Sequence, residues 1–161
     1  MKRKLYTIGY SGFDIESFID KLLLNEIECL IDVREIPISR KKGFSKNALL
    51  TRLDDAGIGY EHYKALGSPK LLRHKVREDR NYTTFFKGVH RHLQKPGGVE
   101  SITQVIDTSR QLRSCLMCFC PEWENCHRSC VVEKIIEKSY FSFQHLSIDE
   151  KQGRLWRAKA A

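Results

Sequence analysis

The sequence has no internal repeat, no low-complexity tract and no linker rich in proline and glycine. These absences favour one compact domain over several domains joined by flexible segments. No apolar run approaches the roughly 18 residues that a membrane-spanning helix needs, so we expect no membrane partner. The basic N-terminus leads into an apolar stretch that is too short for a signal peptide, and we therefore expect a cytoplasmic protein.

The chain does have the composition of a soluble globular protein, with 41% apolar and 30% charged residues among 161. Its 28 basic residues exceed its 20 acidic ones and give a net charge of +8. This excess favours anionic partners such as nucleic acid or phosphorylated metabolites, although a solvated basic surface would show the same balance. Six cysteines in a reducing compartment indicate metal binding, thiol chemistry or burial rather than a disulfide framework.

Short apolar runs alternate with helix-like stretches along the chain. The pattern predicts strands at 4–9, 28–34, 58–63, 112–120 and 141–147, and helices at 13–25, 45–57 and 127–139. Such alternation is typical of an α/β fold, and we expect one layered domain over residues 1–150, with a mostly parallel sheet of about five strands and helices on both faces. Residues 68–111 are predicted to form a helical insertion beside the sheet, and residues 151–161 a basic C-terminal tail.

Polar and sulfur-bearing residues follow the predicted strands and open one predicted helix. Because the carboxyl ends of parallel strands meet at one edge of a sheet, we expect these residues to line a common crevice. The candidate catalytic residues are Asp32, Cys118, Cys126 and His127, and the candidate residues for anion binding are Ser11, Arg34, Ser39 and Arg128.

The helix start near Cys126 carries most of the expected chemistry. Unpaired backbone N–H groups and a partial positive charge at that end favour an anion, and they also lower the pKa of a nearby thiol. Cys118 or Cys126 would then act as a nucleophile, or His127 as an acid or base. The alternative for Asp32 and Arg34 is a salt bridge that fixes a loop, and cysteines on a strand often serve only as small buried side chains.

Zinc binding is a further interpretation of the cysteines. Cys115 and Cys118 lie three residues apart on a predicted strand and so point to opposite faces, which disfavours a site that uses both. A site formed by Cys118, Cys120 and Cys126 is geometrically easier. We assign no cofactor and keep zinc as an alternative. The spacing of cysteine, five residues and arginine that marks a protein phosphatase is absent from residues 115–130.

Four motifs in order carry a resemblance to a known family. They are "TIGYSG" near the start, "IDVREIPISRKKGFSKNAL" at 31–49, "GIGYEHYKALG" at 57–67 and "LMCFCPEWENCHRSCVVEKI" at 116–135. Together they resemble the family called domain of unknown function 488, which implies a small, intracellular, prokaryotic α/β protein without an established biochemistry. The chain departs from the family pattern at Cys120, where an acid is usual, and at Tyr10, where histidine is frequent.

The residues of this chain that match the family pattern include most of the candidate site. They are Gly9, Ser11, Asp32, Arg34, Pro37, Ser39, Phe44, Ser45, Leu66, Gly67, Cys118, Cys126, His127 and Arg128. Three hypotheses about function remain open at this point. The first is an enzyme that acts on an anionic, phosphate-bearing substrate, with nucleic acid or a nucleotide as the leading class. The others are a nucleic-acid-binding protein without catalysis and a structural zinc module.

Overall fold

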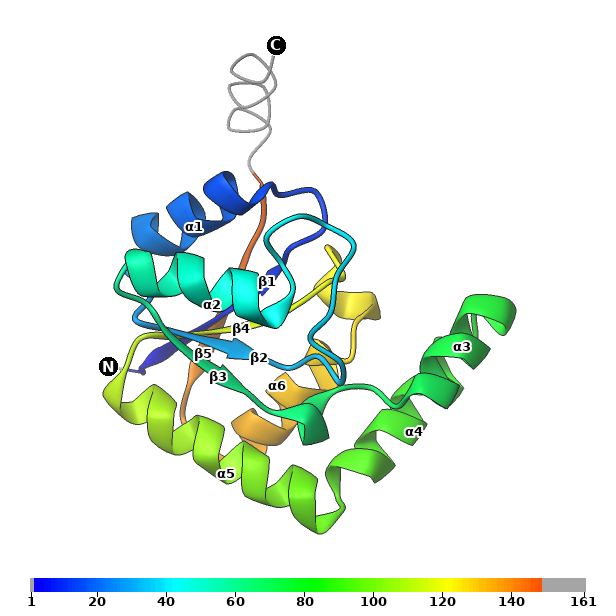
Figure 1. Ribbon diagram of the computed structural model, residues 1–161. Coiled ribbons are helices and arrows are strands. Elements are labelled where there is room, and N and C mark those ends of the chain that lie inside the picture. Colours follow the sequence, from blue (N-terminus) through cyan, green and yellow to red (C-terminus); the bar gives the residue numbers. More distant parts are fainter. Residues whose placement is uncertain (1, 149–161) are drawn as a thin grey trace.

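A parallel five-stranded sheet forms the centre of the computed structural model, which describes residues 2–148 (Figure 1). Its strands are β1 (Lys4–Gly9), β2 (Cys29–Asp32), β3 (Gly59–His62), β4 (Ser114–Cys118) and β5 (Ser142–Leu146). They lie in the order β3-β2-β4-β1-β5, and every neighbouring pair is parallel. The predicted α/β fold class is thereby confirmed. The predicted basic tail at 151–161 lies outside the described residues.

Six α-helices connect the strands and cover both faces of the sheet (Figure 1). They are α1 (Ile15–Leu24), α2 (Lys46–Asp55), α3 (Lys70–Asp79), α4 (Tyr82–Leu93), α5 (Pro96–Gln111) and α6 (Arg128–Lys138), and two short 3₁₀ turns, η1 (Lys64–Leu66) and η2 (Trp123–Asn125), lie between them. Within residues 2–148, no helix combines the length and the apolar character that crossing a membrane requires.

Successive residues along each central strand point to opposite faces of the sheet, and they pack into two separate cores. Ile31 and Leu116 point into the core that α4, α5 and α6 cover. Leu30 and Met117, one position away on the same strands, point into the core beneath α1 and α2. Because both faces are buried, the central strands are continuous apolar runs, which explains why the sequence pattern identified them.

The predicted helical insertion at 68–111 divides into two parts in the structure. The hairpin of α3 and α4 extends from the body beside the carboxyl edge of the sheet, and α3 has no buried residue (Figure 1). In contrast, α5 is a regular layer helix that packs Ile102, Val105 and Ile106 into the core and leads directly into β4. Only the α3–α4 hairpin is therefore an addition to the alternating fold.

The fourth strand ends earlier than the sequence pattern predicted. It leaves the sheet after Cys118, so that Phe119 and Cys120 belong to the following loop. Gly9 at the end of β1 permits this path, because a Cβ atom there would lie 1.7 Å from the carbonyl oxygen of Cys120. A side chain at position 9 would push the loop away. The motif at the end of β1 thus shapes the cysteine-rich loop next to it.

Candidate functional site

The carboxyl ends of β1 and β4 are neighbours at the centre of the sheet. The chain leaves β1 towards β2 on one side, whereas it leaves β4 towards β5 on the other side. Connections that diverge in this way create a crevice above the strand ends, which is the usual ligand site of open α/β sheets. Several of the predicted site residues follow these strand ends.

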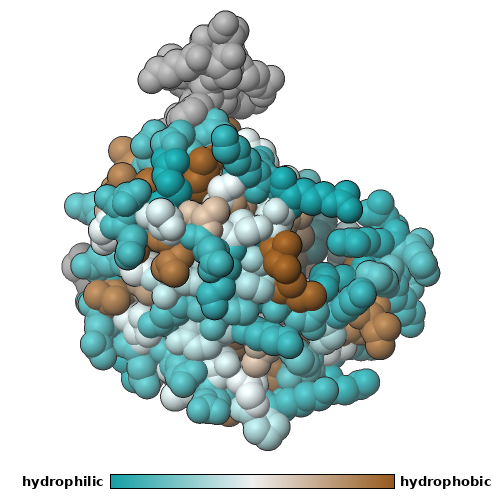
Figure 2. Space-filling view, in the orientation of Figure 1, coloured by the Kyte–Doolittle hydropathy of each residue, from teal (hydrophilic) through white to brown (hydrophobic). Residues whose placement is uncertain are grey.

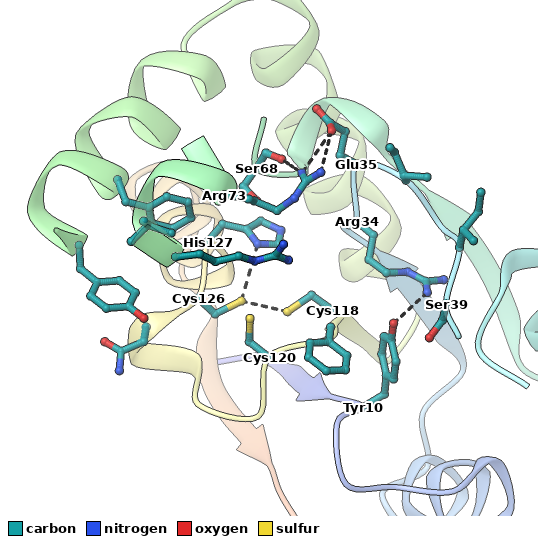
Figure 3. Close-up of a pocket in the computed structure, with 18 of the residues that line it drawn as sticks. Tyr10, Arg34, Glu35, Ser39, Ser68, Arg73, Cys118, Cys120, Cys126 and His127 are labelled. Carbon is teal, nitrogen blue, oxygen red and sulfur yellow. Dashed lines mark hydrogen bonds and ion pairs between the residues drawn. The ribbon is translucent and has the colours of Figure 1, made fainter. Parts of the chain in front are cut away.

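A cavity of about 500 Å³ opens at this edge, a volume within the usual range for small-molecule sites. Figure 2 shows it as a hollow between the body and the region of α3, with a hydrophobic patch at its edge. One wall comes from the segment that follows β2, the other from α3 and α4, and the floor from the end of β4 and the start of α6 (Figure 3). The floor contains Cys118, Cys120, Cys126 and His127.

The sulfur of Cys126 contacts three neighbouring groups at the floor of the cavity. Its Sγ lies 2.9 Å from Sγ of Cys118 and 3.7 Å from Nδ1 of His127 (Figure 3). The backbone nitrogen of Arg128 donates to the same sulfur at 3.5 Å. Burial alone would raise the pKa of the Cys126 thiol, but hydrogen bonds from Cys118 and Cys120 and the charge of His127 hold that pKa well below its usual value. Burial raises the pKa of Cys118 well above its usual value.

His127 has a defined tautomer because of its other neighbour. Its Nε2 lies 2.8 Å from the carbonyl oxygen of Val33, which can only accept, so Nε2 carries a proton and donates it. Nδ1 is then the nitrogen that faces Cys126 and can take up or release a proton. Burial would lower the pKa of His127, but the negative charge of the Cys126 sulfur outweighs burial and raises it.

Arg128 lies behind the floor and does not line the cavity. Its side chain is only 1% exposed. It donates to the hydroxyl of Thr7 at 3.3 Å and to the carbonyl oxygen of Cys120 at 2.7 Å, while its Nε has no hydrogen-bond partner among the described residues. Burial lowers its pKa, but the nearby sulfurs of Cys118 and Cys126 raise it, so the guanidinium stays charged beneath the cysteines.

Asp32 and Arg34 form a buried salt bridge. The carboxylate of Asp32 is fully buried and accepts from Nε and NH2 of Arg34 at 2.9 and 2.7 Å, and from the hydroxyl of Tyr60 at 2.6 Å. NH1 of Arg34 donates to the carbonyl oxygen of Phe44 at 2.7 Å and to the hydroxyl of Tyr10 at 3.4 Å. Four of the five donors of Arg34 are thus in use, and the pair fixes the loop after β2.

The structure brings together some of the predicted site residues and sets others apart. Arg34, Ser39, Cys118, Cys126 and His127 line the cavity. Asp32 lies beneath Arg34, and Arg128 lies beneath the cysteines, so both hold other side chains in place. Ser11 does not line the cavity; its backbone nitrogen donates to the carbonyl oxygen of Phe119.

The second wall of the cavity comes from the predicted helical insertion, whose residues sequence reasoning did not place at the crevice. Arg73, Arg77, Tyr82 and Phe85 of α3 and α4 face the cysteine floor across it, together with Arg40 from the first wall. Arg73 pairs with Glu35 at 3.1 Å and donates to the carbonyl oxygen of Ser68. For the exposed Arg40 and Arg77, no carboxylate partner occurs among residues 2–148. The signal for this wall was the mixture of basic and aromatic residues between 70 and 95.

Three thiols at the floor could hold a metal ion. The sulfur atoms of Cys118, Cys120 and Cys126, which we call the thiol cluster, all lie within 4.8 Å of one another. In contrast, Cys115 is fully buried in the core beneath α1 and α2, on the opposite face of β4 from Cys118, as the strand period predicted. Cys130 is buried in the other core. All six cysteines are free thiols.

Comparison with known proteins gives a family match. Among curated proteins, none matches the chain. A family model described as domain of unknown function DUF488 matches residues 14–135, about three quarters of the chain. The match contains the loop after β2, the α3–α4 hairpin and the thiol cluster, and it therefore includes nearly every residue that lines the cavity. The chain belongs to the domain of unknown function DUF488 family, as the motifs in its sequence had indicated.

Proposed function

We propose that this protein is an enzyme that acts on a phosphate-bearing substrate of nucleotide size, either free or within a strand of nucleic acid. One observation carries the proposal: arginines and aromatic rings line a single cavity that ends in thiols and an imidazole. The arginines would hold the phosphate groups, and the rings would stack on a base. The floor would then supply the reacting groups.

The distribution of charge supports an anionic ligand at this cavity. The two segments that form the walls, residues 34–46 and 69–95, contain thirteen basic residues and three acidic ones. The whole chain has a net charge of +8, so the rest of the chain is slightly acidic. A basic surface kept only for solubility would be spread more evenly. Four of these basic residues, Arg34, Arg40, Arg73 and Arg77, line the cavity itself, which favours an anionic ligand there.

Arg40 and Arg77 are the strongest candidates for direct contact with phosphate. Both line the cavity with exposed side chains. Arg34 and Arg73 are engaged with carboxylates, so they present less free charge to a ligand. The cavity alone would accommodate one nucleotide, and basic residues of the α3–α4 hairpin outside the cavity would contact further phosphates of a longer strand.

The apolar side chains of the cavity fit a ligand with an aromatic part. Tyr82 and Phe85 contact each other edge to face on α4, with ring centroids 6.4 Å apart. On the other side of the cavity, Phe119 is 53% exposed and packs edge to face against Tyr10. An exposed aromatic ring beside arginines is a usual platform for a nucleobase, because every base offers a flat apolar face.

The binding part of the proposal is tested with fluorescein-labelled single-stranded DNA and RNA oligonucleotides, using fluorescence anisotropy at several salt concentrations. We expect binding that weakens as salt increases, and competition by nucleoside monophosphates. Arg77→Ala should weaken binding, whereas Arg110→Ala should not, because Arg110 pairs with Asp107 on the exposed face of α5. Equal affinities for wild type and Arg77→Ala would remove the cavity from the proposal.

The catalytic part is tested by incubating the tightest ligand with the protein and following the ligand by mass spectrometry. We expect a change in its mass with the wild-type protein and none with His127→Gln. His127 lies in the cavity floor and carries the only imidazole among the described residues that line the cavity. An unchanged ligand after prolonged incubation with wild type would overturn catalysis and leave only binding.

A further inference from the structure

The thiol cluster has the composition and the arrangement of a metal site with one open position. One of its three sulfurs comes from Cys118, the last residue of β4, and the other two come from Cys120 and Cys126 in the segment between β4 and α6. Two thiolates on one tetrahedral zinc ion are about 3.8 Å apart, given a zinc–sulfur bond of about 2.3 Å. The present 2.9 Å between Cys118 and Cys126 would need to open by roughly 0.9 Å, within the reach of small side-chain rotations.

A buried cation without a carboxylate partner lies against this cluster. The guanidinium of Arg128 is 1% exposed, and its Nε makes no hydrogen bond among the described residues. Burying such a charge is costly unless an opposite charge lies close to it. The guanidinium donates to the carbonyl oxygen of Cys120 at 2.7 Å, and the backbone nitrogen of Arg128 donates to Sγ of Cys126 at 3.5 Å. The structure therefore provides a positive charge for an anionic group at the thiol cluster.

We propose that Cys118, Cys120 and Cys126 bind one zinc ion as thiolates and leave its fourth position open to the cavity. Three thiolates and a divalent cation give a net charge of −1, which Arg128 neutralises. The backbone N–H of Arg128, which points at the sulfur of Cys126 at 3.5 Å, would support that ligand. Because all three cysteines line the cavity, the open position faces the ligand space.

The proposal rests on the proposed function, since it assigns the reacting group of the same cavity. A zinc ion with three protein ligands and one open position activates a water molecule or polarises a substrate oxygen. His127, whose Nδ1 lies 3.7 Å from Sγ of Cys126, lies beside the thiol cluster. The arginine walls would bring a phosphate-bearing substrate to the same place.

Metal analysis of the purified protein tests the proposal, with thiols kept reduced and the zinc content measured by mass spectrometry. We expect about one equivalent of zinc per chain, and less than about a tenth in Cys118→Ser, Cys120→Ser or Cys126→Ser. Cys115→Ala is the matched control, because Cys115 lies on the same strand but faces the opposite core. It should keep its zinc.

Cobalt provides a second measurement that does not depend on activity. Cobalt added to the metal-free protein should give a sulfur-to-cobalt charge-transfer band in the near ultraviolet, and the band should be lost in the three serine variants. Circular dichroism shows whether each variant is folded. A folded wild-type protein with three reactive thiols, no zinc and no cobalt band would overturn the metal site. If that metal-free protein still bound oligonucleotides through Arg77, the proposed binding function would stand without the metal site. A protein that contains zinc but does not bind oligonucleotides would refute the proposed function and keep the metal site.

Discussion

Two arginines are buried at the same edge of the sheet, and they differ in how their charge is balanced. The guanidinium of Arg34 pairs with the buried carboxylate of Asp32, and four of its five N–H donors have hydrogen-bond partners. Arg128 is even less exposed but has no carboxylate partner among the described residues, and its Nε has no acceptor there. Burial lowers the pKa of Arg128, but the sulfurs of Cys118 and Cys126, two members of the thiol cluster, raise it.

This difference indicates a structural role for the Asp32–Arg34 pair and a functional role for Arg128 and the thiol cluster. The buried charge of Arg34 is already balanced by the carboxylate of Asp32, so this pair holds the loop that forms one wall. A buried charge that faces thiols instead favours their ionised form, or a metal held by them. The four predictions below test this contrast, from the largest expected effect to the smallest.

Asp32→Asn should destabilise the protein most. It leaves the guanidinium of Arg34 buried without its counter-charge, and breaking a buried pair in this way costs about 3–5 kcal/mol. Urea unfolding followed by circular dichroism measures the loss. Asp107→Asn, which breaks the exposed pair with Arg110, should cost less than about 1 kcal/mol. A similar small cost at Asp32 would show that the buried pair is not the element that fixes the loop.

Zinc should stabilise the wild-type protein but not the serine variants of the thiol cluster. At a free zinc concentration of about 100 times the Kd, binding to the folded state adds about 2.7 kcal/mol to the free energy of unfolding. Unfolding curves of metal-free protein with and without zinc give the value. Cys118→Ser should show no such gain. An equal gain in Cys118→Ser would place the bound zinc elsewhere.

Substitutions of Arg128 should separate its charge from its shape. Arg128→Gln removes the charge behind the thiol cluster and should weaken zinc binding about 10- to 100-fold, the usual cost of losing a group that supports metal ligands. Arg128→Lys keeps the charge and should restore most of the affinity. Competition with a chelator of known affinity measures both variants, and thermal melts monitor their folding. Affinities that do not differ between the glutamine and lysine variants would contradict a role for the charge.

The smallest effect is expected at the exposed arginines of the cavity. Arg77→Ala should weaken oligonucleotide binding roughly five- to tenfold, because it removes one charged contact to phosphate. It should also reduce the dependence of log K on log salt by about one unit of slope. Neither zinc content nor stability should change, since the side chain is exposed. A lower affinity with an unchanged salt slope would indicate a contact other than phosphate.

The fold could be predicted because each buried strand is a continuous apolar run and each helix shows a single apolar stripe. The meeting of Arg34, Cys118, Cys126 and His127 could also be predicted, since all of them follow strand ends or precede a helix. The position of Cys120 in a loop could not be predicted. The period-two spacing of the sequence extends the strand through Cys120, whereas in the structure β4 ends at Cys118 and the backbone of Cys120 lies against Gly9.

The position of the α3–α4 hairpin was the main feature beyond the reach of sequence reasoning. Its basic and aromatic residues are visible in the sequence, but their direction depends on how α4 packs Val89 and Leu93 against the core. The direction in which the Arg128 side chain points could not be predicted from the sequence either. Spacing alone places it at the beginning of α6, whereas the packed structure turns its side chain towards Thr7 and away from the cavity.

The central claim is that a phosphate-bearing ligand occupies the cavity above the thiol cluster. The most direct test is the rate at which N-ethylmaleimide labels each cysteine of the metal-free protein, resolved by peptide mass spectrometry, with and without a saturating oligonucleotide. We predict that the ligand slows labelling of Cys120, the one cysteine of the described residues that is not buried, and leaves Cys29, Cys115 and Cys130 unchanged. Equal labelling of Cys120 with and without bound oligonucleotide would contradict the account.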